Sequence, residues 1–231
     1  MSDEHVTVRC DGLIRLGEAG YCGEDGALGH GDDMSDQLVP KVVASLVRDN
    51  HRIMQVAAGS LHTVLLTDKG EVLTCGNGGG GQLGHGDRQN QLVPKVVASL
   101  VRDKHRIVQL AAGDYHTVLL TASGDVYTFG KNDYGQLGRT GITTDLAPGK
   151  VGDLSGIVQI TAGFYHTVAL TAEGDVYTFG KQGDGALGRT DNGWDDDNTP
   201  GRVKLGDFAT DKPHIEVKQV AAGAGHTVIL T

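Results

Sequence analysis

The sequence IVQLAAGDYHTVLLTASGDVYTFGKNDYGQLG, residues 107–138, decides the fold of this 231-residue chain because it recurs. A close relative, IVQITAGFYHTVALTAEGDVYTFGKQGDGALG, occupies residues 157–188. The shorter stretch AAGxxHT occurs four times, beginning at positions 57, 111, 161 and 221, with Thr161 replacing the first alanine in the third copy. Self-similarity at a period of this size indicates stacked or radial repeats.

A second motif alternates with the first and marks the end of each unit. It reads GALG at 26–29, GQLG at 81–84, GQLG at 135–138 and GALG at 185–188. Between the two motifs the unit has short runs rich in β-branched and aliphatic residues, separated by glycine and aspartate, which is typical of an antiparallel meander. In VYTF neither face is charged, so we expect this strand to be covered on both sides.

The fourth, outer strand of each unit is harder to place. The candidates follow prolines: PKVVASL at 40–46 and at 94–100, and PGKV at 148–151. We predict strands there, because each repeat needs one more strand to complete a four-stranded sheet. The spacing of valine and leucine keeps a short helix open as the alternative over 42–49 and 96–103.

Charge and cysteine content exclude several classes of protein. The formal net charge is −9 and there is no run of lysine or arginine, so direct nucleic-acid binding is not expected, whereas a basic protein partner is compatible. Three cysteines without a CxxC pair predict neither a disulfide framework nor a zinc site. The acidic N-terminus has no apolar core, and no apolar run is long enough to span a membrane. We therefore expect a cytoplasmic or nuclear protein that is not secreted and has no membrane partner.

The full pattern AAGxxHTVxLTxxGxVYTFGxNxxGQLG resembles the repeat of the regulator of chromosome condensation family, over about residues 11–231. The resemblance implies an all-β chain, a β-propeller of four-stranded antiparallel blades with about one repeat per blade. We predict a single repeat domain over residues 1–231. Its parts are a degenerate partial repeat at 5–50, repeats at about 51–104, 105–155 and 156–215, and a partial repeat at 216–231.

The number of repeats raises the question of ring closure. A complete ring of this family usually has about seven repeats, whereas this chain has about four. We therefore expect an incomplete ring, or half of a ring completed by self-association with a second copy. A small closed ring in which the two ends of the chain pair is the alternative.

The order of strands predicts where the turns lie. In an antiparallel blade the AAGxxHT and GxNxxGQLG turns share one face, and the turns DKG, ASG and AEG lie on the opposite face. Several residues of the first two turns are candidate partner-binding residues, and packing against the next blade is the equally weighted alternative for the aromatic ones. These candidates are Asp114, Tyr115, Tyr134, Phe164 and Tyr165.

The stretch DNGWDDDN, residues 191–198, lies in the longest spacing between repeats and holds the single tryptophan. A solvated acidic loop is the simplest interpretation, and its spacing does not match an EF-hand calcium loop. As a docking loop for a basic partner it supplies four further candidates: Trp194, Asp195, Asp196 and Asp197.

The recurring histidines and glycines are predicted to be structural. Equivalent histidines on successive blades should lie well apart, which argues against a metal site, and each ring nitrogen should bond backbone near a blade junction. These structural positions are His62, His116, His166, His226, Gly59, Gly113, Gly163 and Gly223. The GxGxxG string at 76–81 is not followed by a helix, so no dinucleotide site is expected.

No nucleophile–base set is visible, so we predict no catalytic residues, no cofactor and no enzyme activity. The chain is best interpreted as a non-catalytic scaffold or adaptor that binds a protein partner. Two alternatives follow from the resemblance. One is a guanine-nucleotide exchange factor for a Ran-type small GTPase, as for the founding member of the family. The other is the propeller portion of a larger ubiquitin-ligase-like protein.

Overall fold

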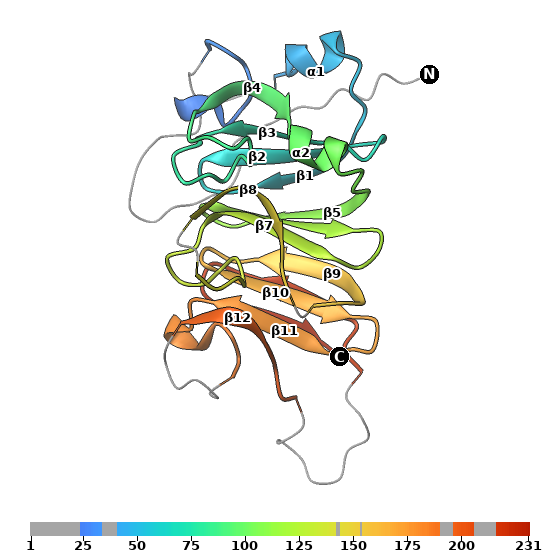
Figure 1. Cartoon of the computed structure of the whole chain (residues 1–231), viewed down its shortest axis with the longest axis vertical. Helices are drawn as coiled ribbons and strands as arrows, with labels where there is room; N and C mark the ends of the chain where they lie inside the picture. Colours follow the sequence, from blue (N-terminus) through green and yellow to red (C-terminus); the bar gives the residue numbers. More distant parts are fainter. Residues whose placement is uncertain (1–23, 34–40, 142–143, 153, 190–195, 206–215) are drawn as a thin grey trace.

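The computed structural model describes residues 24–33, 41–141, 144–152, 154–189, 196–205 and 216–231. These residues form three four-stranded antiparallel sheets and one two-stranded sheet (Figure 1). Within each four-stranded sheet the strands are ordered as in the sequence, so each sheet is one meander and constitutes one blade. The structure thus confirms the predicted all-β fold of four-stranded blades.

The strands repeat with nearly constant length. The first blade contains β1 (Ile53–Ala58), β2 (His62–Thr67), β3 (Val72–Gly76) and β4 (Gln91–Val96). The second contains β5 (Ile107–Ala112), β6 (His116–Thr121), β7 (Val126–Lys131) and β8 (Thr144–Lys150). The third contains β9 (Ile157–Ala162), β10 (His166–Thr171), β11 (Val176–Gly180) and β12 (Asp197–Arg202), and the fourth contains β13 (Gln219–Ala222) and β14 (Thr227–Leu230).

Helical segments are short and lie between strands. They are η1 (Glu24–Gly26), α1 (Ala44–Arg48), α2 (Ala98–Arg102) and η2 (Gly183–Gly185). In the part of the chain that the structure describes, no helix is both long and apolar enough to cross a membrane.

The segment that follows the outer strand of a blade differs in one detail from the sequence-based prediction. Over residues 94–100 the strand β4 ends at Val96, and α2 begins at Ala98, so the predicted strand and the alternative helix follow one another. At 40–46 the strand prediction is not met: among the described residues only the bridge residue Val42 precedes α1, which begins at Ala44. The helices form because Val97 and Leu100, three residues apart, both reach the core between blades. Of the predicted strand at 148–151, residues 148–150 belong to β8, which ends at Lys150.

The second strand of each blade is the most buried element. All six residues of HTVLLT in β6 are buried, because blades cover both faces of this strand. Its partner β7 contains Gly130, which has φ +111° and opposes His116. A Cβ at this position would lie 2.3 Å from the carbonyl oxygen of Tyr115, so the close approach of the two strands requires glycine.

The hydrophobic core is divided among the junctions between blades. Between the first two blades, Val64, Leu66 and Val72 pack against Leu110 and Phe129. The next junction uses the equivalent positions, with Ile160 in the place of Leu110 and Phe179 in the place of Phe129. Each blade therefore buries its apolar side chains mainly against its neighbours.

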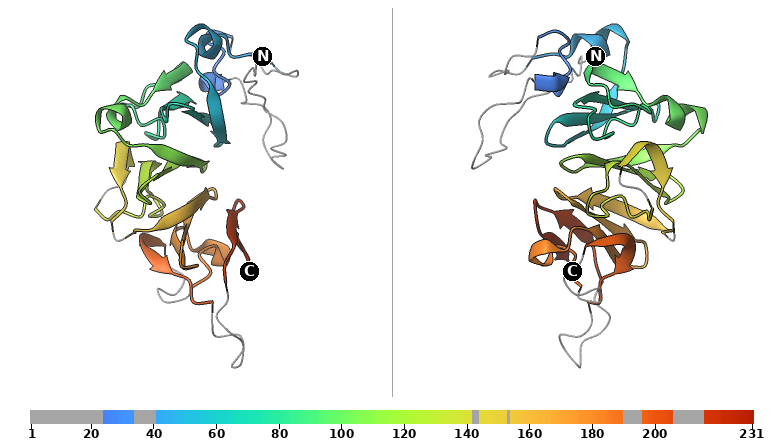
Figure 2. Two further views of the ribbon diagram at one scale, coloured as in Figure 1. Left: turned by 90° about the vertical axis from the view of Figure 1, so that its right-hand side faces the viewer. Right: turned by 60° about the vertical axis from the view of Figure 1, so that its left-hand side comes forward.

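The blades follow one another along an arc, with the inner strands β1, β5, β9 and β13 toward its centre (Figure 2). The described residues do not close the arc into a ring, as the repeat count predicts. The last sheet consequently lacks cover on one side. Val118 and Leu120 of β6 are fully buried, whereas the equivalent Val228 and Leu230 of β14 are 53% and 54% exposed.

Candidate functional site

The two kinds of turn predicted to share a face do lie together. The backbone amide of Lys131, at the end of β7, donates to the carbonyl of Tyr115 in the β5–β6 turn at 2.9 Å. In the third blade, Lys181 and Tyr165 repeat this bond at the same distance. We call this end of the blades, formed by the AAGxxHT turns and the loops that follow β3, β7 and β11, the AAG face.

Aromatic rings from two adjacent blades gather on the AAG face. The ring centroids of Tyr134 and Tyr165 are 5.1 Å apart, and those of Phe164 and Tyr165 are 6.3 Å apart. The amine of Lys181 lies 5.2 Å from the ring centroid of Tyr134 and 5.5 Å from that of Tyr165. All these side chains are partly exposed. They therefore pack across a blade junction and still present ring surface to solvent.

Tyr115 completes this group on the second blade. Its ring lies under the amine of Lys131, 4.7 Å from the ring centroid. We define the aromatic cluster as Tyr115, Tyr134, Phe164, Tyr165 and the two lysines Lys131 and Lys181. The lysines were missed by sequence reasoning, although both follow the glycine of the repeated FGK, where a side chain must leave the buried strand.

Two adjacent hollows open on the same face. The first, of about 190 Å³, is lined by the second alanine, the glycine and the following residue of all four AAGxxHT turns, and we call it the axial pocket. The second, of about 180 Å³, lies beside it and is lined by Phe164, Tyr165 and Lys181 among others. Phe164 and Ala224 line both hollows, so the two hollows adjoin at these residues.

Asp114 contributes the carboxylate of the axial pocket. The residue is only 4% exposed, and its Oδ1 accepts a hydrogen bond from the Ser60 hydroxyl at 2.9 Å. Burial and the nearby Asp114 charge raise the pKa of the Tyr165 hydroxyl. Asp114 thus connects the axial pocket to the aromatic cluster.

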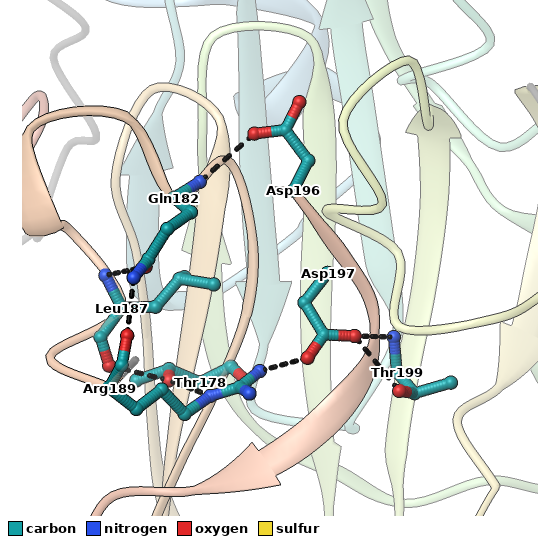
Figure 3. Close-up of polar contacts among 7 residues, drawn as sticks. All are labelled: Thr178, Gln182, Leu187, Arg189, Asp196, Asp197 and Thr199. Carbon is teal, nitrogen blue, oxygen red and sulfur yellow. Dashed lines mark hydrogen bonds and ion pairs between the residues drawn. The ribbon is translucent and has the colours of Figure 1, made fainter. Parts of the chain in front are cut away.

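The acidic stretch at 191–198 divides into parts with different roles. Trp194 and Asp195 lie outside the described residues. Asp196 is exposed, and its carboxylate accepts a hydrogen bond of 3.0 Å from the backbone amide of Gln182. Asp197, in contrast, is buried at the start of β12, where its Oδ2 lies 2.5 Å from Nη2 of Arg189 (Figure 3).

The surroundings of Asp197 assign it a structural role. Its other oxygen accepts bonds from the amide and hydroxyl of Thr199. Burial alone would raise the pKa of this carboxyl, but the hydrogen bonds from Thr199 and Arg189 hold it below its usual value. The interpretation of this stretch as a solvated loop therefore does not apply to Asp197, because this residue is buried and paired with Arg189. The sequence does not reveal that Arg189 faces it.

The histidines connect successive blades through threonine hydroxyls, where the sequence predicted backbone contacts, and His166 has a backbone contact with His226 in addition. His62 Nε2 lies 3.0 Å from the hydroxyl of Thr117 in the next blade, and this hydroxyl donates to the carbonyl of Gln82. The hydroxyl can therefore only accept from the ring, so Nε2 carries the proton. The same bond joins His116 to Thr167 at 3.1 Å, and His166 to Thr227 at 3.2 Å.

Burial keeps these imidazoles neutral. It lowers the pKa of His62 to about 4 and that of His116 to about 3. The ring of His62 packs against Gly59, where a Cβ would lie 2.3 Å from Cε1. The glycine of AAGxxHT is thus required by space for the ring, and the fully buried rings have no route to a metal ion or substrate. Among the residues that the structure describes, no three metal-ligating side chains lie together.

Comparisons with known proteins identify the architecture. The family model of the RCC1-like domain matches residues 18–231. The structure resembles Prp20p from Saccharomyces cerevisiae, described with its binding properties to Gsp1p and histones, at a TM-score of 0.74 and 26% identity. The match covers 91% of this chain and 49% of that one.

Curated relatives of this chain are much longer proteins. The human inhibitor of Bruton tyrosine kinase is 44% identical over 111 residues, 48% of this chain and 8% of the relative. The human E3 ubiquitin-protein ligase HERC2 is 40% identical over 151 residues, 64% of this chain and 3% of the relative. Since the model of the domain covers nearly the whole sequence and the fold agrees, this chain belongs to the RCC1-like domain family.

Proposed function

We propose that this chain is a protein-interaction module that binds its partner through the AAG face. The observation that carries the proposal is the aromatic cluster, whose tyrosine, phenylalanine and lysine side chains are partly exposed beside two hollows. Tyrosine-rich surfaces of this kind provide large contact areas with little loss of side-chain entropy, and they recur at the centre of protein interfaces. The likeness to Prp20p, which binds Gsp1p and histones, supports a protein as the partner.

A selection experiment with matched variants tests the proposal. The complete chain is used to select binders from a random-peptide display library, and each binder is then measured on two variants. Tyr134→Ala with Tyr165→Ala removes two rings of the AAG face, whereas Asp68→Ala with Glu173→Ala alters exposed residues of turns at the opposite end. We expect binders that lose at least about tenfold in affinity on the first variant only. Binders that respond only to the second variant would place recognition on the opposite face and contradict the proposal.

A second candidate function is guanine-nucleotide exchange on a Ran-type GTPase. It is favoured by the fold likeness to Prp20p, a protein that binds Gsp1p. Exchange requires no covalent chemistry, only a surface that stabilises the nucleotide-free GTPase. The test is the release of a fluorescent nucleotide from the loaded GTPase in the presence of the chain. Acceleration that is lost in the Tyr134→Ala, Tyr165→Ala variant supports this function, and an unchanged intrinsic rate rules it out.

A further inference from the structure

Asp114 is a buried carboxylate for which the described part of the chain supplies no cation. The side chain lines the axial pocket and is 4% exposed, with the hydroxyls of Ser60 and Tyr165 as its hydrogen-bond partners. Among the described residues, no lysine or arginine forms an ion pair with it. A buried charge without an opposite charge destabilises a fold unless other bonds replace the lost hydration.

Asp197 is a buried carboxylate of the same chain that has a structural role and a cationic partner. Its exposure, 5%, is almost that of Asp114, yet it lies 2.5 Å from the guanidinium of Arg189. The two cations on the face of Asp114 are engaged differently, because Lys131 and Lys181 lie over tyrosine rings. Asp114 therefore stands out as a charge whose counter-ion is not provided by its surroundings.

A comparison of the four repeats shows whether the fold requires a carboxylate at this position. The positions equivalent to Asp114 in the other AAGxxHT turns are Ser60, Phe164 and Ala224. The backbone is bonded in the same way at successive turns: the amide of Asp114 donates to the carbonyl of Phe164, and that of Phe164 to Ala224. A hydroxyl, a ring and a methyl group are thus all compatible with this turn, and a carboxylate is not required by it.

The shape of the axial pocket suits the end of a long cationic side chain. Its walls are mainly the alanine and glycine residues of the four turns, which leave space, and the ring of Phe164 lies at the border to the second hollow. An aromatic ring next to a carboxylate attracts a cation from two directions. The net charge of −9 also favours the approach of a positively charged partner.

We propose that the axial pocket accepts a lysine or arginine side chain of the protein partner, which forms an ion pair with Asp114. This inference rests on the proposed function, and it adds the chemical nature of the group that the AAG face recognises. Because the partner supplies the missing cation, Asp114 contributes to binding and not to the stability of the free chain.

The test uses binders selected from the random-peptide display library on the complete chain. Each binder is measured on Asp114→Asn, which keeps the size of the side chain and removes its charge, and on Asp133→Asn, which removes an exposed charge from a neighbouring turn. We expect the selected peptides to share a lysine or arginine, and Asp114→Asn to weaken their binding by about tenfold or more, with little effect from Asp133→Asn. Replacing the shared arginine by citrulline, which has no charge, should cause the same loss on the wild-type chain and no further loss on Asp114→Asn.

The unfolding free energy of the same variants provides an independent readout. If Asp114 serves binding, Asp114→Asn leaves the stability of the free chain unchanged or higher, and a clear loss of stability would overturn the inference. Peptides that depend on Tyr134 and Tyr165 but neither share a cation nor respond to Asp114→Asn would overturn the inference while the proposed function stands. Selection that yields no binder dependent on these tyrosines would overturn both.

Discussion

The ion pair between Arg189 and Asp197 provides the sharpest prediction about stability. Substituting Arg189→Leu removes the guanidinium that lies 2.5 Å from this carboxylate, and both side chains are at most 6% exposed. The change also removes bonds from Arg189 to the carbonyl and hydroxyl of Thr178. Leaving a buried charge without its partner typically costs about 3–5 kcal/mol. We expect a loss of this size in the unfolding free energy.

The second blade contains the matched control. There Arg139 and Asp145 form the same pair at 2.6 Å, but their side chains are 17% and 28% exposed. Water can solvate the carboxylate of Asp145 after Arg139→Leu, so we expect a smaller loss of about 1–2 kcal/mol. The comparison isolates burial, because Arg139 also bonds the carbonyl and hydroxyl of the equivalent Thr128.

Urea unfolding followed by far-ultraviolet circular dichroism gives the two free energies by linear extrapolation. Hydrogen exchange of the amides in β11 and β12 shows whether the loss is centred on the third blade. An equal loss for Arg139→Leu and Arg189→Leu would refute the argument from burial. A loss below about 1 kcal/mol for Arg189→Leu would refute the structural role of the pair itself.

Three further predictions each include a control variant. Gly113→Ala should destabilise the chain by about 1–3 kcal/mol, because its Cβ would lie 2.1 Å from the His116 ring, whereas Gly152→Ala, with nothing within 4 Å, should be nearly neutral in the same urea assay. Leu120→Ala should cost about 2–5 kcal/mol and Leu230→Ala less than about 1, since Leu120 is 2% and Leu230 54% exposed; equal midpoints would show that the last sheet is covered. The pKa of buried His62 is lowered from 6.5 to about 4, so the unfolded chain binds more protons between these values, and stability is lost as pH falls from about 6.5 toward 4. At pH 5 this histidine alone should reduce the unfolding free energy by roughly 2 kcal/mol, and His62→Gln should remove that part of the pH dependence.

Much of the fold is predictable because the repeat constrains it many times over. The strands, their order and the face shared by two kinds of turn follow from the alternation of β-rich runs with glycine turns, repeated along one chain. The outer connection is less predictable. The sequence around Val97 and Leu100 is compatible with a strand and with a short helix. The helix is favoured by the burial of both side chains between blades, which the sequence alone does not show.

Contacts between blades are the part that a repeat pattern does not reveal. The hydroxyl of Thr117 accepts a hydrogen bond from His62 although 55 residues separate them, and nothing in the HT pair distinguishes this bond from one to backbone. Likewise, Asp197 belongs to a run of three aspartates in the sequence, and its burial depends on the side chain of Arg189. The aromatic residues of the AAG face were found from their places in the turns, but their contacts with Lys131 and Lys181 depend on the distance between neighbouring blades.

The direction of the histidine–threonine bonds has a consequence for synthesis. The ribosome releases the first blade before the second, so His62 has no hydroxyl partner until Thr117 has emerged, and His116 then waits for Thr167. Each blade reaches its final hydrogen-bonded state only after its successor has been made. The histidine–threonine bonds can therefore form only in order from the N-terminal side. During translation, the bond of each blade forms after the next blade has been synthesised.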